Sequence, residues 1–368
     1  MEIKLNKVDN EKLNKLLEVN DNNLNLSDLL TFYFENLARG INKKDIEAIT
    51  KLNHFSKKDG FFYLLLNILN LDSQDRDTLL LAKSYLYQNI YQLNINRYQN
   101  NPYLRKIAFN KSYNKEIKLI NDCYLPYEGF PLFDVFVEED NYFKENYSIG
   151  FFEEKYNFQA ITHSNTTWMS IIPNEIETMK DDIEIVKGNV LVYGLGLGYF
   201  AYMISLKSDV NKITIVEKDS KIIDLFNRII LPQFENKNKI IIVNEDAFSF
   251  EKNCKEQFDY AYVDLYHGSN DGIEIYLKFK QLELRSQNYL YWLENSLINV
   301  IRRNLITIIF EHVNNMNCSY TASSNFNDKI INNLYNIIID KTFSSYQEIH
   351  NLIASENIKK IVKLHKLF

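Results

Sequence analysis

Hydrophobic positions repeat every three or four residues through the first hundred residues of the chain. In residues 72–93 acidic residues come first, and the apolar side chains that follow are Leu79, Ala82, Leu86, Ile90 and Leu93. This spacing places the apolar side chains on one face of a helix, and acids at a helix start favour its dipole. Residues 27–37 and 44–52 have the same spacing. The pattern predicts a helical N-terminal region over residues 1–110.

The pattern changes between residues 111 and 172. Residues 132–138 and 147–161 are rich in β-branched and aromatic side chains, and glycines and a proline interrupt them. Such composition is typical of short strands joined by turns. We therefore predict a small β-rich section over residues 111–172.

Residues 173–315 alternate apolar runs with helical patterns, which is typical of a mostly parallel sheet flanked by helices. The apolar runs cover residues 190–193, 212–217, 240–244 and 258–264. A long helix is predicted over residues 282–303 and a fifth strand over residues 305–312. The predicted fold class is α/β with a Rossmann-like domain, followed by a helical tail over residues 316–368.

Three glycines spaced two apart follow the first apolar run, at Gly194, Gly196 and Gly198. Glycine lets a strand turn sharply into a helix beneath a ligand, because no Cβ stands in the way. The start of that helix then offers unpaired N–H groups to the polar end of the ligand. The loop therefore predicts a nucleotide-cofactor site.

Acidic residues follow the other predicted strands. Glu217 ends the second strand, Asp246 and Ala247 follow the third, and Asp264 ends the fourth. The carboxyl ends of parallel strands meet at one sheet edge, where ligands bind, so we expect these residues around one crevice. The alternative is that such acids only cap helices or lie in solvated turns.

The glycine loop, Glu217, the Asp246-Ala247 pair and Asp264 together resemble the class I S-adenosylmethionine-dependent methyltransferase fold, and the segment before the loop is similar to the spermidine-synthase-like branch. The resemblance implies S-adenosyl-L-methionine as cofactor. By this resemblance the glycines hold its methionine part and Glu217 its ribose hydroxyls. Asp246 and the Ala247 backbone would recognise adenine, and Asp264 would face the reacting end.

One departure from that family concerns the reaction. Aminopropyltransferases of the spermidine-synthase type carry a second aspartate three residues after the first, where this chain has His267. A histidine cannot supply the negative charge that attracts a polyamine ammonium. The Asn/Asp-Pro-Pro-aromatic motif of enzymes that methylate base amines is also missing after Asp264.

We therefore expect methyl transfer, with Asp264 and His267 as the candidate catalytic residues and His267 as the candidate base. A loop histidine without a role is the alternative for His267. An aminopropyltransferase that uses decarboxylated S-adenosylmethionine and a non-catalytic Rossmann-like scaffold remain the other hypotheses.

A dinucleotide-binding oxidoreductase is the nearest rival within the same fold. Residues 196–201 also fit the dinucleotide fingerprint, and Glu217 would suit the ribose of NAD. The Asp246-Ala247 pair and the position of Gly194 at the strand end favour S-adenosylmethionine. We expect the acceptor between the loop after Asp264 and the β-rich section. Trp168 and Glu175 are candidates for closing over it, and for Trp168 a packed core position is the favoured interpretation.

Composition narrows the partners. A formal charge of −6 argues against a broadly basic nucleic-acid surface and favours a small-molecule or protein acceptor, although a local patch at Arg302 and Arg303 stays open. Three cysteines without close spacing, Cys123, Cys254 and Cys318, indicate neither a disulfide framework nor a zinc site. No metal is expected.

The charged N-terminal segment lacks an apolar signal region, which predicts a cytoplasmic location. Residues 188–206 are free of charge over a length that could span a membrane. The spaced glycines make strand, loop and helix the better interpretation, so no membrane contact is expected. The oligomeric state, a homodimer included, is left open.

Overall fold

The computed structural model describes residues 1–108, 117–163, 166–316 and 326–367. Its centre is a five-stranded, all-parallel sheet in the order β12-β11-β10-β13-β14. The strands are β10 (Gly188–Tyr193), β11 (Val210–Glu217), β12 (Ile240–Asn244), β13 (Tyr260–Val263) and β14 (Tyr289–Tyr291). This sheet confirms the predicted Rossmann-like α/β fold.

Helices connect these strands, as parallel pairing requires. They are α9 (Tyr199–Ser205), α10 (Ser220–Leu225) with the π-helical turn η3 (Phe226–Ile230) and the 3-10 turns η4 (Leu231–Gln233) and η5 (Lys237–Lys239), α11 (Ala247–Asn253) and α12 (Ser269–Lys280). Two short helices, α7 (Pro173–Thr178) and α8 (Lys180–Ile185), precede β10. The carboxyl ends of β10, β11, β12 and β13 therefore lie at one edge, as predicted.

The predicted fifth strand over residues 305–312 is wrong. These residues belong to helix α13 (Glu294–Val313), and the predicted helix over residues 282–303 contains strand β14. Residues 305–312 are rich in isoleucine, which favours a strand. The buried positions Leu297, Ile301, Leu305, Ile308 and Ile309 follow the 3.6-residue period instead, so packing of a helix face overrode local propensity.

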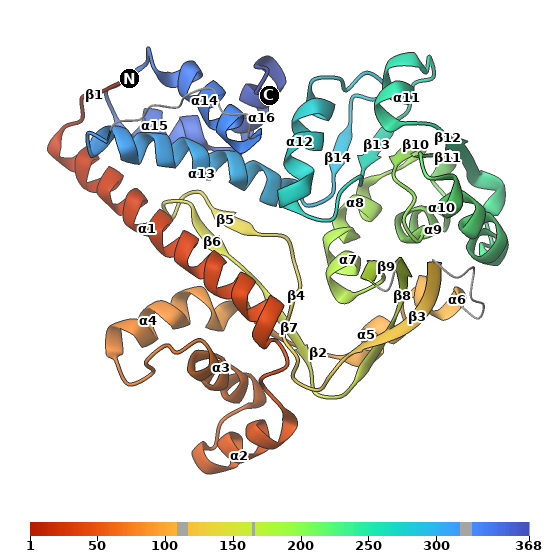
Figure 1. Cartoon of the computed structure of the whole chain (residues 1–368), viewed down its shortest axis with the longest axis horizontal. Helices are drawn as coiled ribbons and strands as arrows, with labels where there is room; N and C mark the ends of the chain where they lie inside the picture. The colour runs from red at the N-terminus through yellow and green to blue at the C-terminus, as the bar shows by residue number, and fades with distance from the viewer. Residues whose placement is uncertain (109–116, 164–165, 317–325, 368) are drawn as a thin grey trace.

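The N-terminal region is helical as far as residue 89, with the long helix α1 (Lys7–Phe32) crossing the molecule in Figure 1. The other elements are η1 (Tyr33–Leu37), α2 (Lys43–Asn53), α3 (Lys57–Ile68), α4 (Arg76–Tyr85) and η2 (Tyr87–Asn89). Ile90 and Leu93 do not continue the predicted helix, because they lie in strand β2 (Ile90–Leu93), which pairs with β7. Two short helices follow, α5 (Ile95–Gln99) and α6 (Pro102–Lys106).

The β-rich section forms small sheets beside the Rossmann-like unit. One contains β2, β7 (Ile149–Phe152) and β4 (Phe130–Pro131); another contains β3 (Ile117–Tyr124), β8 (Tyr156–His163) and β9 (Thr166–Ser170); and β5 (Phe136–Glu138) pairs with β6 (Lys144–Asn146). The predicted strand over residues 132–138 is thus limited to β5. In Figure 1, β9 and α7 lie next to the carboxyl edge of the central sheet.

The C-terminal region is helical and packs against the first helix. It contains α14 (Phe326–Ile338), β15 (Thr342–Phe343), α15 (Tyr346–Ile353) and α16 (Ser355–Leu364). Helix α1 contacts α13 and α15, and β1 (Glu2–Ile3) pairs in parallel with β15. The two termini therefore lie in the same part of the molecule (Figure 1).

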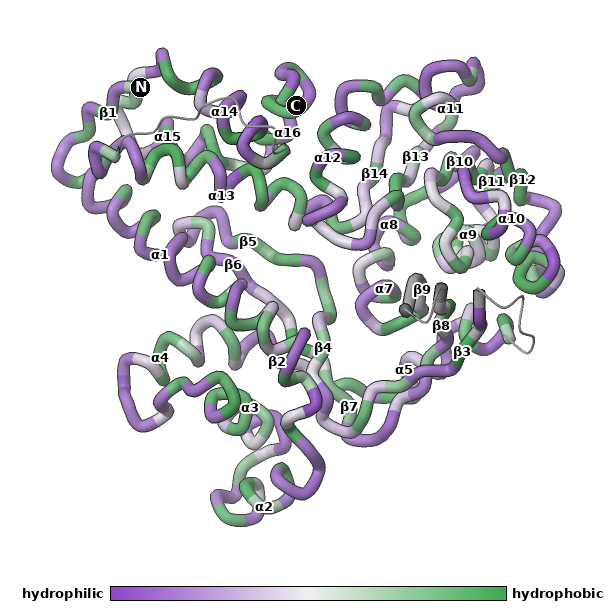
Figure 2. Tube along the Cα trace, viewed as in Figure 1, coloured by the Kyte–Doolittle hydropathy of each residue, from purple (hydrophilic) through white to green (hydrophobic). Residues whose placement is uncertain are grey.

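Arg302 and Arg303 do not form a basic surface patch. Arg302 is buried and ion-paired with Glu139, and Arg303 is ion-paired with the buried Glu145. Hydrophobic and hydrophilic residues alternate along α13 in Figure 2, as expected of a helix with one buried face. Within the described ranges, no helix is long and apolar enough to span a membrane.

Cys123 and Cys254 are free, whereas Cys318 lies outside the described residues. In the described part of the chain, no group of three or more histidine, cysteine, aspartate or glutamate side chains could hold a metal ion.

Candidate functional site

A cavity of about 480 Å³ opens at the carboxyl edge of the central sheet. Among its lining residues are all those predicted from the sequence, namely Gly194, Gly196, Gly198, Glu217, Asp246, Ala247, Asp264 and His267. Parallel pairing brings them together, because they follow four different strands of one sheet. Their individual roles stay predictions.

The three glycines of the loop are needed for different structural reasons, because a Cβ would meet different surroundings at each. All have positive φ, but a Cβ on Gly194 would lie 1.9 Å from the backbone oxygen of Asp264, and one on Gly198 would lie 2.4 Å from the Phe226 ring. A Cβ on Gly196 would meet no atom within 4 Å. Gly194 and Gly198 thus allow close packing within the protein, whereas Gly196 leaves open space at the cavity wall, where a ligand can approach the backbone.

Glu217 fixes the glycine loop from the end of the neighbouring strand. One carboxylate oxygen accepts a hydrogen bond from the Leu195 N–H (3.1 Å) and the other from the Asp219 N–H (2.8 Å). A carboxylate oxygen can accept more than one hydrogen bond, so the half-buried Glu217 can also accept from ribose hydroxyls. The side chain therefore supports the loop as well as the predicted ribose contact.

Asp246 lines the cavity, as predicted, and it also caps helix α11, which was the alternative role. Its side chain accepts a hydrogen bond from the Ser249 N–H (3.0 Å) at the start of α11, and Asp246 is exposed. Ala247, the first residue of that helix, is buried against the cavity. The short Ala247 side chain leaves room for a flat group beside its backbone.

Two carboxyl groups in this cavity have raised pKa values. Burial raises the pKa of Asp264 to about 7, the charge of Glu217 adds to the shift, and His267 opposes it. Burial, together with the charge of Asp264, raises the pKa of Glu175 well above its ordinary range. Glu175 comes from α7, and no described group forms a hydrogen bond with its carboxyl. Among the described residues, no lysine or arginine forms an ion pair with either carboxyl.

His267 lies at the exposed rim of the cavity. Its side chain is 70% exposed, and its Nδ1 lies 3.0 Å from the Asp271 carboxylate, which also accepts from the His267 and Gly268 N–H groups. When Nδ1 carries the proton that Asp271 accepts, Nε2 is available as a base. The histidine thus has a partner that orients it, which the sequence did not reveal.

Two aromatic residues of the cavity wall were missed in the sequence. Tyr262 stacks on Phe200 with ring centroids 3.8 Å apart, and its buried hydroxyl has no partner among the described residues. Trp292 follows β14, and its backbone N–H donates to the Val263 carbonyl. Tyr262 lies two residues before Asp264 in the apolar run predicted as a strand over residues 258–264, so strand alternation could have indicated it. Trp292 was missed because β14 was not recognised.

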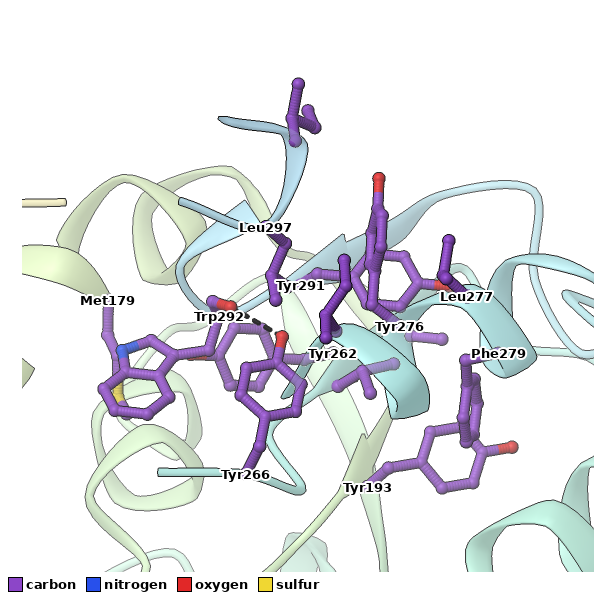
Figure 3. Packing of buried hydrophobic residues seen from close by; sticks show 14 of the residues in the cluster. Met179, Tyr193, Tyr262, Tyr266, Tyr276, Leu277, Phe279, Tyr291, Trp292 and Leu297 are labelled. Carbon is purple, nitrogen blue, oxygen red and sulfur yellow. Dashed lines mark hydrogen bonds between the residues drawn. The ribbon is translucent and has the colours of Figure 1, made fainter. Parts of the chain in front are cut away.

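Figure 3 shows how this wall is packed. The Tyr266 hydroxyl donates to the Trp292 carbonyl (2.6 Å), and the Trp292 indole lies beside Met179. The indole N–H also donates to the Thr178 hydroxyl of α7 (2.9 Å). These bonds hold the end of the sheet against the helix that carries Glu175.

The opposite wall comes from β9 and the residues after it, including Met169, Ser170 and Ile171. The end of the predicted β-rich section therefore lines the same cavity as the predicted site residues. The Trp168 side chain, which we expected to help close the site, lies outside the described residues.

Comparisons with known proteins bear on this segment. Residues 183–283 match the spermine/spermidine synthase domain, as the sequence resemblance predicted. The match extends from α8 to the residues after α12 and includes the glycine loop, Glu217, Asp246, Ala247, Asp264 and His267, but not Glu175. A search of curated proteins finds no match.

Solved structures with similar parts include a conserved hypothetical protein from Streptococcus pyogenes, with 16% identity and a TM-score of 0.24 over 29% of this chain and 66% of the other. Spermidine synthase from Thermotoga maritima has 14% identity and a TM-score of 0.30 over 40% and 59% of the two chains. A putative O-methyltransferase from Klebsiella pneumoniae has 13% identity and a TM-score of 0.29 over 46% and 70%. The chain covers less than two thirds of the first two proteins.

Proposed function

We propose that the chain is an S-adenosylmethionine-dependent methyltransferase acting on a small-molecule or protein acceptor. The observation that carries this proposal is the pair of acids with raised pKa values, Glu175 and Asp264, beside the glycine loop. Asp264, which ionises near neutral pH, suits the ammonium of an amino acid. Glu175, whose pKa is raised mainly by burial, can donate a hydrogen bond to the carboxylate when it is protonated.

The other parts of the cavity fit the same donor. Among the described residues, no group accepts a hydrogen bond from the N–H groups of Gly196, Leu197 and Tyr199, so these can bind polar atoms of a ligand. In this proposal Glu217 binds the ribose hydroxyls, and Asp246 with the Ala247 backbone binds adenine. The sulfonium supplies an activated methyl group.

The chain's own contribution to the reaction is to hold the acceptor in line with that methyl group and to take up a proton. His267, oriented by Asp271, is the candidate base for an acceptor that loses a proton. The aromatic side chains of Tyr262, Tyr266 and Trp292 keep water from the inner wall.

Aminopropyl transfer from decarboxylated S-adenosylmethionine is the second candidate. Glu175 brings to the cavity a second carboxyl that the sequence lacks after Asp264, and two ionised acids would suit a donor with an ammonium but no carboxylate. The domain match over residues 183–283 also favours this candidate.

Calorimetry on the wild-type protein and Glu175→Gln separates the candidates. The donors to compare are S-adenosylmethionine, its decarboxylated form, S-adenosylhomocysteine and NAD. The glutamine amide mimics a protonated acid, so Glu175→Gln should keep the affinity for S-adenosylmethionine within about threefold, well under the 1.4 kcal/mol of a factor of ten. Tighter binding of the decarboxylated donor, lost in Glu175→Gln, would favour aminopropyl transfer. NAD binding alone would support the oxidoreductase, and binding of none the scaffold.

A further inference from the structure

The peptide unit between Leu197 and Gly198 in the glycine loop is held at both ends. The Tyr103 hydroxyl of α6 donates to the Leu197 carbonyl (2.5 Å), and the Gly198 N–H donates to the Leu195 carbonyl (2.8 Å). Because a peptide unit is planar, fixing its carbonyl and its N–H fixes its orientation. Tyr103 is fully buried, so water does not compete for this bond.

The start of helix α9 is held by the same segment. The Asn101 side-chain amide donates to the Tyr199 hydroxyl (3.0 Å), and the Asn101 side-chain oxygen accepts from the Tyr103 N–H (3.0 Å). The Tyr103 ring packs edge-on against Tyr199 and Tyr202, each at 5.5 Å between ring centroids. Asn101 and Tyr103 therefore act on the loop and on the first turn of α9 together.

The preceding helix, α5, contacts α7, the helix that carries Glu175. Arg97 donates to the carboxylate of Glu177 in α7 (2.7 Å), and the Tyr98 hydroxyl donates to its other oxygen (2.8 Å). Glu177 is buried and lies two residues after Glu175. The segment of residues 95–106, which we call the brace, thus contacts both the glycine loop and the helix that carries Glu175.

We propose that Tyr103 is a positioning residue for the donor site, acting through the Leu197 carbonyl. By fixing the 197–198 peptide it holds in place the cavity-lining residues Gly196, Leu197 and Tyr199, whose N–H groups donate to no described group. The brace lies in the N-terminal region, outside the residues that match the synthase domain. The part of this inference that concerns binding rests on the proposed function, whereas the part that concerns the loop does not.

Tyr103→Phe tests the proposal, with Tyr156→Phe as the matched control. Tyr156 is also fully buried, but its hydroxyl has no partner among the described residues. In the ligand-free protein, hydrogen–deuterium exchange over residues 194–200 should be faster in Tyr103→Phe and unchanged in Tyr156→Phe. A second control, Tyr98→Phe, should speed exchange over residues 173–178 and leave the loop unchanged.

S-adenosylhomocysteine is the probe for binding. Its dissociation constant should rise at least fivefold in Tyr103→Phe and stay within twofold in Tyr156→Phe, with melting temperatures of the two variants close together. Asn101→Ser is a second variant with the same expected direction if Tyr103→Phe does not fold. Serine keeps a capping oxygen for the Tyr103 N–H and removes the donor to Tyr199.

Loop exchange and S-adenosylhomocysteine affinity in Tyr103→Phe that both equal those of Tyr156→Phe would overturn the proposal. If the wild-type protein binds no S-adenosylhomocysteine, the proposed methyl transfer fails, and the exchange measurement alone decides the role of Tyr103.

Discussion

Glu175 and Asp264 reach the same cavity from α7 and from the end of β13, and the charge of Asp264 helps raise the pKa of Glu175. The sequence predicts both residues near the acceptor but does not predict that their carboxyl groups interact. Two buried acids that lie close together destabilise their own ionised forms, and a cationic ligand relieves this cost. The pair therefore connects the stability of the empty protein to its affinity for a donor.

The first prediction concerns pH. Both acids have a higher pKa in the folded protein than in the unfolded chain, so the folded state binds more protons between about pH 4 and pH 7. The ligand-free protein should therefore lose stability as the pH rises through this window and beyond. Thermal unfolding of the wild-type protein and of Asp264→Asn from pH 5 to 8 checks this. A steeper loss in Asp264→Asn than in the wild-type protein would contradict it.

Ionisation of Asp264, which lowers the stability of the ligand-free protein, should raise its affinity for the donor. The affinity for S-adenosylhomocysteine should rise from pH 6 to pH 8 in the wild-type protein, because ionised Asp264 binds the ammonium. In Asp264→Asn the affinity should be lower at pH 8, and the increase should be much smaller. Calorimetry at three pH values measures this. Equal pH profiles for the two proteins would remove Asp264 from the ammonium site.

Glu217→Ala should weaken donor binding in a folded protein. The variant loses the predicted charge-assisted hydrogen bonds to ribose, each worth about 1.5–3 kcal/mol, and also releases the Leu195 N–H of the glycine loop. Affinity for S-adenosylhomocysteine should fall at least tenfold. Glu245→Ala is the matched control, because Glu245 follows the adjacent strand but does not line the cavity. If both variants bind like the wild-type protein, Glu217 makes no donor contact.

The three loop glycines should separate stability from binding. Alanine at Gly194 or Gly198 meets a clash inside the protein, which together with left-handed strain should cost at least about 2 kcal/mol of unfolding free energy. Gly196→Ala adds the strain alone, about 1–2 kcal/mol, and its Cβ enters open space. Denaturant unfolding should rank Gly196→Ala as the most stable of the three.

Donor binding gives a further measurement on Gly196. Gly196→Val should lose affinity for S-adenosylhomocysteine, since its larger side chain stands where the ligand approaches the backbone. A folded Gly196→Val protein that binds with unchanged affinity would show that the ligand does not contact this part of the loop.

His267→Ala should leave donor affinity within about threefold, because the side chain lies at the exposed rim. Turnover should fall once an acceptor that must lose a proton is supplied. His365→Ala, in the C-terminal region, is the control for loss of an exposed histidine. Full turnover in His267→Ala would show that this histidine only caps the loop through Asp271.

The residues that line the cavity could be predicted because their signals are local. Glu217 and Asp264 stand at the ends of apolar runs, and parallel pairing brings such ends together whatever the connections are. The strand β14 was not predicted because its three residues are too few to show a period. Trp292 follows this strand and was therefore not predicted as a site residue. Tyr103 could not have been predicted, since it meets Leu197 across 94 residues and nothing in the local sequence records that contact.

The pairing of β1 with β15 has a consequence for the synthesis of the protein. Glu2 and Thr342 are separated by 340 residues, so the partner of the first strand leaves the ribosome roughly 20 to 70 s later at usual translation rates. Helix α1 contacts α13 and α15, which are also synthesised late, so much of its packing forms only near the end of translation. Nascent chains should therefore expose Leu13 and Leu16 of α1 until late in translation, which makes this helix a natural contact for a chaperone.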